Sequence, residues 1–277
     1  MMPPAVYALV LFSAVLHAGW NAALRGGADR QWAAGWMALA TFAVALPALP
    51  FLPLPSAACL PYLLFSSVLH CVYMWLLVEA YRHGDLGVAY PIARGSSPIL
   101  VTLGALIVVR EIPSPIALVG IGLVSLGILA IAHDRGRVDR RTVLVSLATG
   151  AAIACYTVSD GLGVRSAGNG LSYNAWLSVS YGLTLSLIFT YRKGVGGWRG
   201  EPRQIWLAVG GGVVSVVAYT LVTLAMRDGA MGLVSALRET SVLFAALIGR
   251  YVLGEELRFR RFAACAAVAL GAVLLAR

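Results

Sequence analysis

The sequence predicts an all-α membrane protein in which ten transmembrane helices form two inverted five-helix repeats. Three observations lead to this fold class. The chain of 277 residues is 60% hydrophobic and only 12% charged, whereas soluble domains carry about 25% charged residues. Its apolar residues fall into ten long segments, and the two halves of the sequence resemble each other.

The ten apolar segments cover almost the whole chain. A hydrocarbon core about 30 Å thick requires roughly 20 apolar residues in one helix, and little sequence remains for a soluble domain or a linker. The start, "MMPPAV", lacks the basic region of a cleaved signal peptide, so we expect the first helix to be retained. The predicted helices are 5–24, 32–52, 61–81, 86–109, 114–133, 142–161, 172–191, 204–226, 231–253 and 261–276.

The repeat is clearest in the fourth and ninth segments. Residues 93–111, "ARGSSPILVTLGALIVVRE", align with residues 237–255, "LRETSVLFAALIGRYVLGE", which places Arg94 on Arg238. We therefore expect one repeat at 1–135 and a second at 136–277. Because five helices are an odd number, the second repeat must cross the membrane in the opposite direction, as in many secondary transporters.

The net charge of +9 does not indicate a nucleic-acid partner, because the basic residues lie in short loops between apolar helices. Most of them occupy the odd-numbered loops, which by the positive-inside rule predicts that both termini lie outside the cytoplasm. The four cysteines are scattered without the spacing of a metal site. We therefore expect no metal, no cofactor and no nucleic acid. The expected partners are a small-molecule substrate and the lipid bilayer, with the protein a monomer or homodimer.

Two arginines stand within the apolar segments, and they are the main candidates for a binding site. Arg94 lies well inside the fourth segment and Arg238 inside the ninth. A charge at the centre of a membrane helix costs about 2.5–3.5 kcal/mol on insertion scales, so such residues face a polar interior. A guanidinium can grip a carboxylate or phosphate with two parallel hydrogen bonds. The alternative is internal pairing of Arg94 with Glu239 or Asp160, and the sequence leaves both open.

Further polar and aromatic residues lie in the same apolar context. His17 and Asn21 share one face of the first helix, and His70 lies in the middle of the third. We expect the cavity to be lined by aromatic side chains and a proton to be carried by an acidic residue or a histidine. The complete set of expected substrate-binding residues is Arg94, Arg238, Glu239, His17, Asn21, Trp20, Tyr90, Tyr219, His70 and Asp160.

Local composition predicts two further structural features. Pro91 and Pro98 lie in the fourth segment, so we expect that helix to be kinked or locally unwound beside Arg94. Gly120, Gly122 and Gly127 of the fifth segment indicate close helix packing against small residues.

The chain resembles the EamA-type members of the drug/metabolite transporter superfamily. The resemblance is carried by "HAGWNAAL" (17–24), "SPILVTLGALIVVRE" (97–111) and "VLFAALIGRYVLGEEL" (242–257). It implies a multi-pass transporter of the bacterial inner membrane, with a central cavity between helices 1, 3, 4, 6, 8 and 9. "YPIARGSSP" (90–98) and "RETS" (238–241) are similar to a subgroup associated with phosphonate utilisation.

The sequence departs from that family at defined positions. Arg110 stands where relatives usually have glycine, and Val242 stands where many have proline. Relatives generally have both termini in the cytoplasm, which conflicts with the loop charges.

We expect a secondary active transporter that moves a small polar or amphipathic metabolite with an acidic group by alternating access, coupled to protons or to exchange. One alternative is a lipid-carrier flippase on the same fold. An intramembrane enzyme is the least favoured alternative, because neither H-E-x-x-H nor G-x-S-x-G occurs.

Overall fold

The structure is a computed structural model that describes residues 3–23, 29–83, 86–133, 139–251 and 259–276. Regular structure in these residues is entirely helical, which confirms the all-α class. The α-helices are α1 Pro4–Ala23, α2 Arg30–Ala45, α3 Leu60–His83, α4 Leu86–Val109, α5 Pro115–His133, α6 Arg140–Ser166, α7 Gly170–Lys193, α8 Pro202–Asp228, α9 Met231–Arg238, α10 Ser241–Tyr251 and α11 Phe259–Leu275.

Each of the ten predicted segments contains a helix, and the ninth contains both α9 and α10. Six stretches of the described chain are long and apolar enough to cross a membrane, and α1 and α5 contain shorter apolar helices. The six are Gln31–Phe51, Ala57–Ala80, Val88–Val109, Arg140–Ser166, Pro202–Asp228 and Met231–Tyr251.

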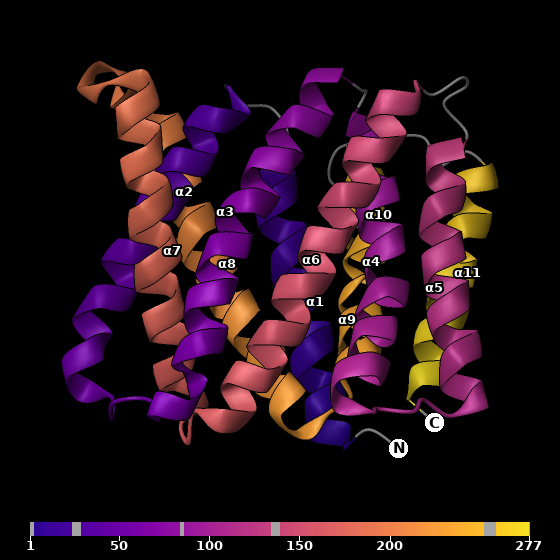
Figure 1. Cartoon of the computed structure of the whole chain (residues 1–277). Helices are drawn as coiled ribbons and strands as arrows, with labels where there is room; N and C mark the ends of the chain where they lie inside the picture. Colours follow the sequence, from indigo (N-terminus) through magenta and orange to yellow (C-terminus); the bar gives the residue numbers. More distant parts are fainter. Residues whose placement is uncertain (1–2, 24–28, 84–85, 134–138, 252–258, 277) are drawn as a thin grey trace.

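Helices from the two predicted repeats alternate in space instead of forming separate bundles. α3 packs on α6, α1 on α8, α2 on α7, and α4 on both α6 and α9. α5 and α11 pack together at one edge of the bundle, opposite the edge formed by α2 and α7 (Figure 1). α1 begins and α11 ends at the same end of the bundle, which we call the terminal end (Figure 1). The division at residue 135 and the inversion of the second repeat stay predictions.

The contact between α5 and α11 depends on glycine. A Cβ atom on Gly271 would lie 2.7 Å from the carbonyl oxygen of Gly120, and one on Gly127 would lie 3.0 Å from the carbonyl oxygen of Ala264. These separations are too short for any larger residue, so the close packing predicted for Gly120 and Gly127 is confirmed. Gly122 faces open space, and the same prediction was wrong for that residue.

α4 does not unwind beside Arg94, so that part of the expectation from its prolines was wrong. The kink, which was the other expected outcome, stays a prediction. The helix continues through Pro91 and Pro98 to Val109. Pro98 has no N–H to donate to the carbonyl oxygen of Arg94, but the Ser97 hydroxyl donates to that oxygen at 3.1 Å. The serine replaces the missing backbone bond, which explains why the proline is tolerated here.

The interruption lies instead in the ninth segment, which contains no proline. α9 ends at Arg238, and α10 begins at Ser241 after a turn at Glu239 and Thr240. The amide of Glu239 donates to the carbonyl of Ala236, and that of Thr240 donates to Leu237, both at 3.1 Å. These tighter i to i−3 bonds end the α-helix at the depth of its charged residues.

The end of α4 has a backbone conformation that glycine favours. Arg110 has a φ of +59°, in the left-handed region that glycine adopts without steric cost. The amide of Glu111 then donates to the carbonyl of Ala105 at 3.2 Å and closes the helix. The strap formed by residues 110–114 continues from this turn to α5.

Arg110→Gly is expected to stabilise the protein by about 1 kcal/mol, because a non-glycine residue in the left-handed region carries a steric cost of about that size. The measurement is the melting temperature of the purified protein in detergent. Arg110→Ala is the matched control, since it removes the same charge but keeps Cβ. Equal melting temperatures for the two variants would contradict this explanation.

Candidate functional site

Charged residues from several helices meet inside the bundle. Arg94 of α4 is 3% exposed, Glu239 after α9 is 1% exposed, and Asp160 of α6 is fully buried. Burial of a charge in a membrane interior is costly unless another charge or a hydrogen bond compensates it. The partners of these three groups therefore define the site.

Arg94 pairs with Glu239 across the interface between α4 and α9. Arg94 Nε lies 2.9 Å from Glu239 Oε2, so the internal ion pair that the sequence left open is present. Within the described part of the chain, however, neither of these two atoms has a hydrogen bond of good geometry, and neither does Arg94 Nη2. The two opposite charges therefore attract each other, but buried N–H donors of the Arg94 guanidinium have no hydrogen-bond acceptor.

Arg238 lies at the end of α9, next to Glu239 in the chain. Its guanidinium carbon is 5.4 Å from the centre of the Tyr219 ring of α8, which is within the range of a cation–π contact. Arg94 has a similar relation to Tyr90, at 5.8 Å. His17 of α1 lies within electrostatic reach of both arginines.

Asp160 is held by tyrosines. The hydroxyl of Tyr173 donates to Oδ1 at 2.8 Å, and the hydroxyl of Tyr219 donates to Oδ2. Both carboxylate oxygens therefore have a donor, and Asp160 does not depend on an arginine. Tyr219 contacts both Asp160 and Arg238, which connects the two groups.

His70 of α3 is enclosed by aromatic rings. Its ring is stacked 4.2 Å from that of Tyr156 and 5.0 Å from that of Tyr181, and Tyr219 meets it edge-on at 5.5 Å. His70 Nδ1 lies 2.9 Å from the carbonyl oxygen of Ser66, which assigns the proton to that nitrogen. His70 thus packs among aromatic rings and also lies within electrostatic reach of Asp160.

The structure brings most of the predicted site residues into one connected group. We call Arg94, Glu239, Arg238, Tyr219, Asp160 and His70 the central polar cluster, with Tyr90 and His17 at its edge. The side chains of Trp20 and Asn21 lie outside the described residues. Sequence reasoning missed Tyr173 and Tyr181, because a tyrosine in an apolar helix has no spacing that marks its partner.

A second charged group, not predicted as a site, lies at the terminal end. Arg165 Nη1 is 2.6 Å from Glu111 Oε1, and the other carboxylate oxygen accepts the amide of Met231 at 2.8 Å. Arg165 also donates to the carbonyl oxygens of Met226 and Gly229, at 2.9 and 2.8 Å. We call Glu111 and Arg165 the terminal clamp.

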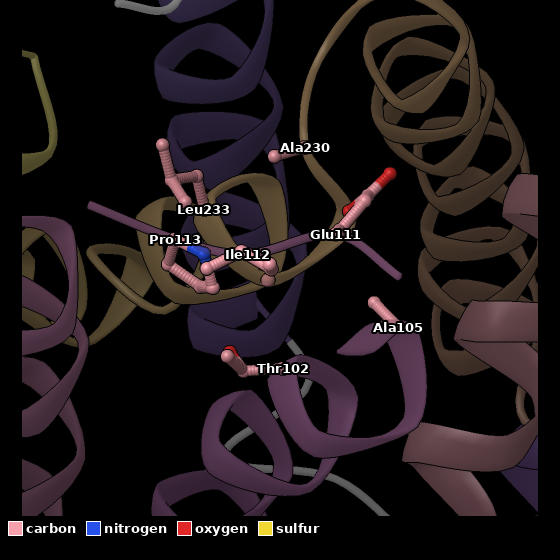
Figure 2. A pocket seen from close by; sticks show the side chains of 8 residues that line it. Thr102, Ala105, Glu111, Ile112, Pro113, Ala230 and Leu233 are labelled. Carbon is pink, nitrogen blue, oxygen red and sulfur yellow. The ribbon is translucent and has the colours of Figure 1, made fainter. Parts of the chain in front are cut away.

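A small cavity lies beside the clamp, between the strap after α4 and the start of α9. Figure 2 shows Ile112 and Pro113 of the strap near Leu233, while the Glu111 side chain points away from them. Its volume of about 130 Å³ is well below the roughly 300–1,000 Å³ typical of small-molecule sites. This cavity is therefore too small to be the substrate site. Among the described residues, no group of three or more His, Cys, Asp or Glu side chains could hold a metal ion.

The comparisons with known proteins agree with this architecture. Residues 140–277 match the model of the EamA-like transporter family. The second half of the chain is an EamA-like transporter domain. This match agrees with the resemblance of the sequence to the EamA-type members of the drug/metabolite transporter superfamily.

The fold of the EamA-like domain and of the rest of the chain has a counterpart among solved structures. A crystal structure with 18% identical residues superposes with a TM-score of 0.77, covering 98% of each chain. At this identity the similarity concerns the fold alone. No curated protein matches the sequence.

Tyr173→Phe is expected to lower the free energy of unfolding by about 1.5–3 kcal/mol, because it removes a donor from a buried carboxylate. The measurement is thermal unfolding in detergent. Tyr191→Phe is the matched control on the same helix, since Tyr191 is 92% exposed. If both variants melt at the wild-type temperature, the hydroxyl of Tyr173 does not stabilise Asp160.

Proposed function

We propose that this protein is a secondary active transporter for a small polar or amphipathic metabolite that carries an acidic group. The observation that carries the proposal is the incomplete pairing of Arg94. Its guanidinium is buried with unsatisfied donors, and a second arginine, Arg238, lies within electrostatic reach of the same groups, His17 and Glu239. A carboxylate, phosphate or phosphonate supplies the acceptor oxygens that these donors lack.

The two acids of the cluster differ in how firmly their carboxylates are held by hydrogen bonds. Asp160 is satisfied by Tyr173 and Tyr219, so it does not compete for the arginines. Glu239 approaches Arg94 without a well-formed hydrogen bond and is therefore the group that an incoming anion displaces. Displacement of Glu239 by the anion is the central event of the proposed binding step.

Coupling follows from the fate of the displaced carboxylate. Once Glu239 is displaced from Arg94, it is a buried carboxylate without a cationic partner. Protonation removes its charge and with it the free-energy cost of keeping a charge away from water. Transport is then coupled to protons. In the absence of a proton, only a second anion can take the place of the first, which gives exchange.

Helix pairing supports an inverted repeat and alternating access. If the repeats are exchanged in order, α1 replaces α6, α3 replaces α8, and α4 replaces the pair α9 and α10. Under this exchange, the contact between α3 and α6 corresponds to the contact between α8 and α1. The contacts of α2 with α7, α4 with α9 and α5 with α11 each correspond to themselves. All of these contacts occur in the structure. Two such halves supply equivalent openings on the two sides of a central site.

We place the protein in the bacterial inner membrane as a multi-pass monomer or homodimer. Loop charges favour termini outside the cytoplasm, whereas the habit of the family favours cytoplasmic termini. A phosphonate is one substrate class that fits two guanidinium groups, in line with the resemblance of residues 90–98 and 238–241.

Arg94→Gln and Arg238→Gln are each expected to weaken binding of an acidic ligand by about 10- to 100-fold, the equivalent of one charge-assisted hydrogen bond of about 1.5–3 kcal/mol. The measurement is ligand-induced thermal stabilisation over a panel of carboxylates, phosphonates and amines. Compounds that stabilise the protein are then tested for uptake into proteoliposomes.

Arg203→Gln is the control, because it removes an exposed arginine at the start of α8. It is expected to leave both binding and uptake unchanged. Stabilisation by amines alone, or full anion binding in both cluster variants, would refute an anion site at Arg94 and Arg238.

A further inference from the structure

The short helix α9 is tied to α4 and to the strap that follows it at both of its ends. At its start, the amide of Met231 donates to Glu111; at its end, Glu239 pairs with Arg94. α9 has eight residues and therefore a length of about 12 Å. A rigid element this short transmits a displacement at one end to the other.

The terminal clamp joins four parts of the molecule through two side chains. Glu111 belongs to the strap between α4 and α5, and Arg165 lies in the last turn of α6. Arg165 binds carbonyls at the end of α8, and Glu111 binds the first amide of α9. Each charge suits the helix end that it contacts, because carboxylates favour N-termini and guanidinium groups favour C-termini.

The clamp closes the terminal end of the bundle. Figure 1 shows the strap at the same end as the start of α1 and the end of α11. Between this end and the central polar cluster lie buried apolar side chains, including Val6, Met226, Val234 and Leu237. In this structure a layer of buried apolar side chains therefore lies beneath the clamp, between it and the central polar cluster.

We propose that the terminal clamp is the lock of this end and that α9 is the lever connecting the lock to the central polar cluster. The inference rests on the proposed transport function. An anion that displaces Glu239 from Arg94 releases one end of α9, and movement of that helix withdraws the Met231 amide from Glu111. The clamp then opens and exposes the apolar layer to water.

Exposure distinguishes this lock from a permanent structural contact. The side chains of Glu111 and Arg165 are 21% and 27% exposed, so water can replace their contacts when they separate. The cavity of about 130 Å³ beside Ile112, Pro113 and Leu233 leaves unfilled space next to the strap. Both features permit opening at low cost.

The test uses Val234→Cys as a reporter in a protein whose four native cysteines are replaced by alanine. Val234 is fully buried beneath the clamp, so a membrane-impermeant maleimide reacts with this cysteine only when the terminal end opens. Glu111→Gln is expected to raise the labelling rate in lipid nanodiscs at least fivefold. Arg165→Lys, which keeps the charge but loses the fork of donors, is expected to raise it less.

Glu79→Gln is the matched control. Glu79, near the end of α3, pairs with Arg141 at the start of α6 at 3.3 Å, so the same substitution breaks another contact between the halves at the opposite end (Figure 1). Labelling is expected to stay at the wild-type rate. An unchanged rate in both clamp variants, or an equal rise in all three variants, would overturn the lock.

A fourth variant separates the lock from the anion site. Arg94→Gln frees Glu239 as the proposed substrate does and is expected to raise labelling to the level of Glu111→Gln. If Glu111→Gln raises the labelling rate and Arg94→Gln does not, the role of α9 as a lever is refuted, while the lock at the terminal clamp is supported. Because the labelling assay needs no ligand, it tests the lock independently of anion binding. The lock can therefore be refuted while the anion site is supported, or the anion site refuted while the lock is supported.

Discussion

The pairing of Arg94 with Glu239 is the interaction on which the interior of this protein depends. Neither charge is tolerable in a membrane alone, and each is nearly inaccessible to water. Their approach requires that α4 and α9 lie side by side. Glu239 makes this contact from the turn between α9 and α10, where the amides of Glu239 and Thr240 donate to the carbonyls of Ala236 and Leu237.

The central polar cluster and the terminal clamp differ in their burial and in the completeness of their hydrogen bonds. In the central polar cluster, burial is deep and the hydrogen bonds of Arg94 are incomplete, so the group is poised to accept another partner. In the terminal clamp, the hydrogen bonds of Arg165 to two backbone carbonyls are well formed but partly exposed. The first arrangement is the basis of the proposed anion site, and the second is the basis of the proposed lock.

Much of this could be predicted from sequence, since the bilayer imposes strong rules on composition. The apolar segments predicted the helices, and the cost of Arg94 and Arg238 predicted that both approach a polar interior. Local unwinding was expected in the fourth segment because a proline is visible in the sequence, whereas the bond from Ser97 to the Arg94 carbonyl is not. The interruption lies in the ninth segment instead. Tyr173 and Arg165 were missed for a related reason: their partners come from other helices, and only packing brings them together.

The tyrosines around Asp160 have an electrical consequence. Because two hydroxyl groups satisfy this carboxylate, it does not require an arginine as a partner. With both acids ionised, the two arginines and two acids of the cluster sum to zero. A monoanion entering alone would carry net charge through the membrane, and its movement would change in free energy by about 2.3 kcal/mol for each 100 mV. An anion accompanied by one proton leaves the sum at zero, and its transport is then indifferent to the membrane voltage.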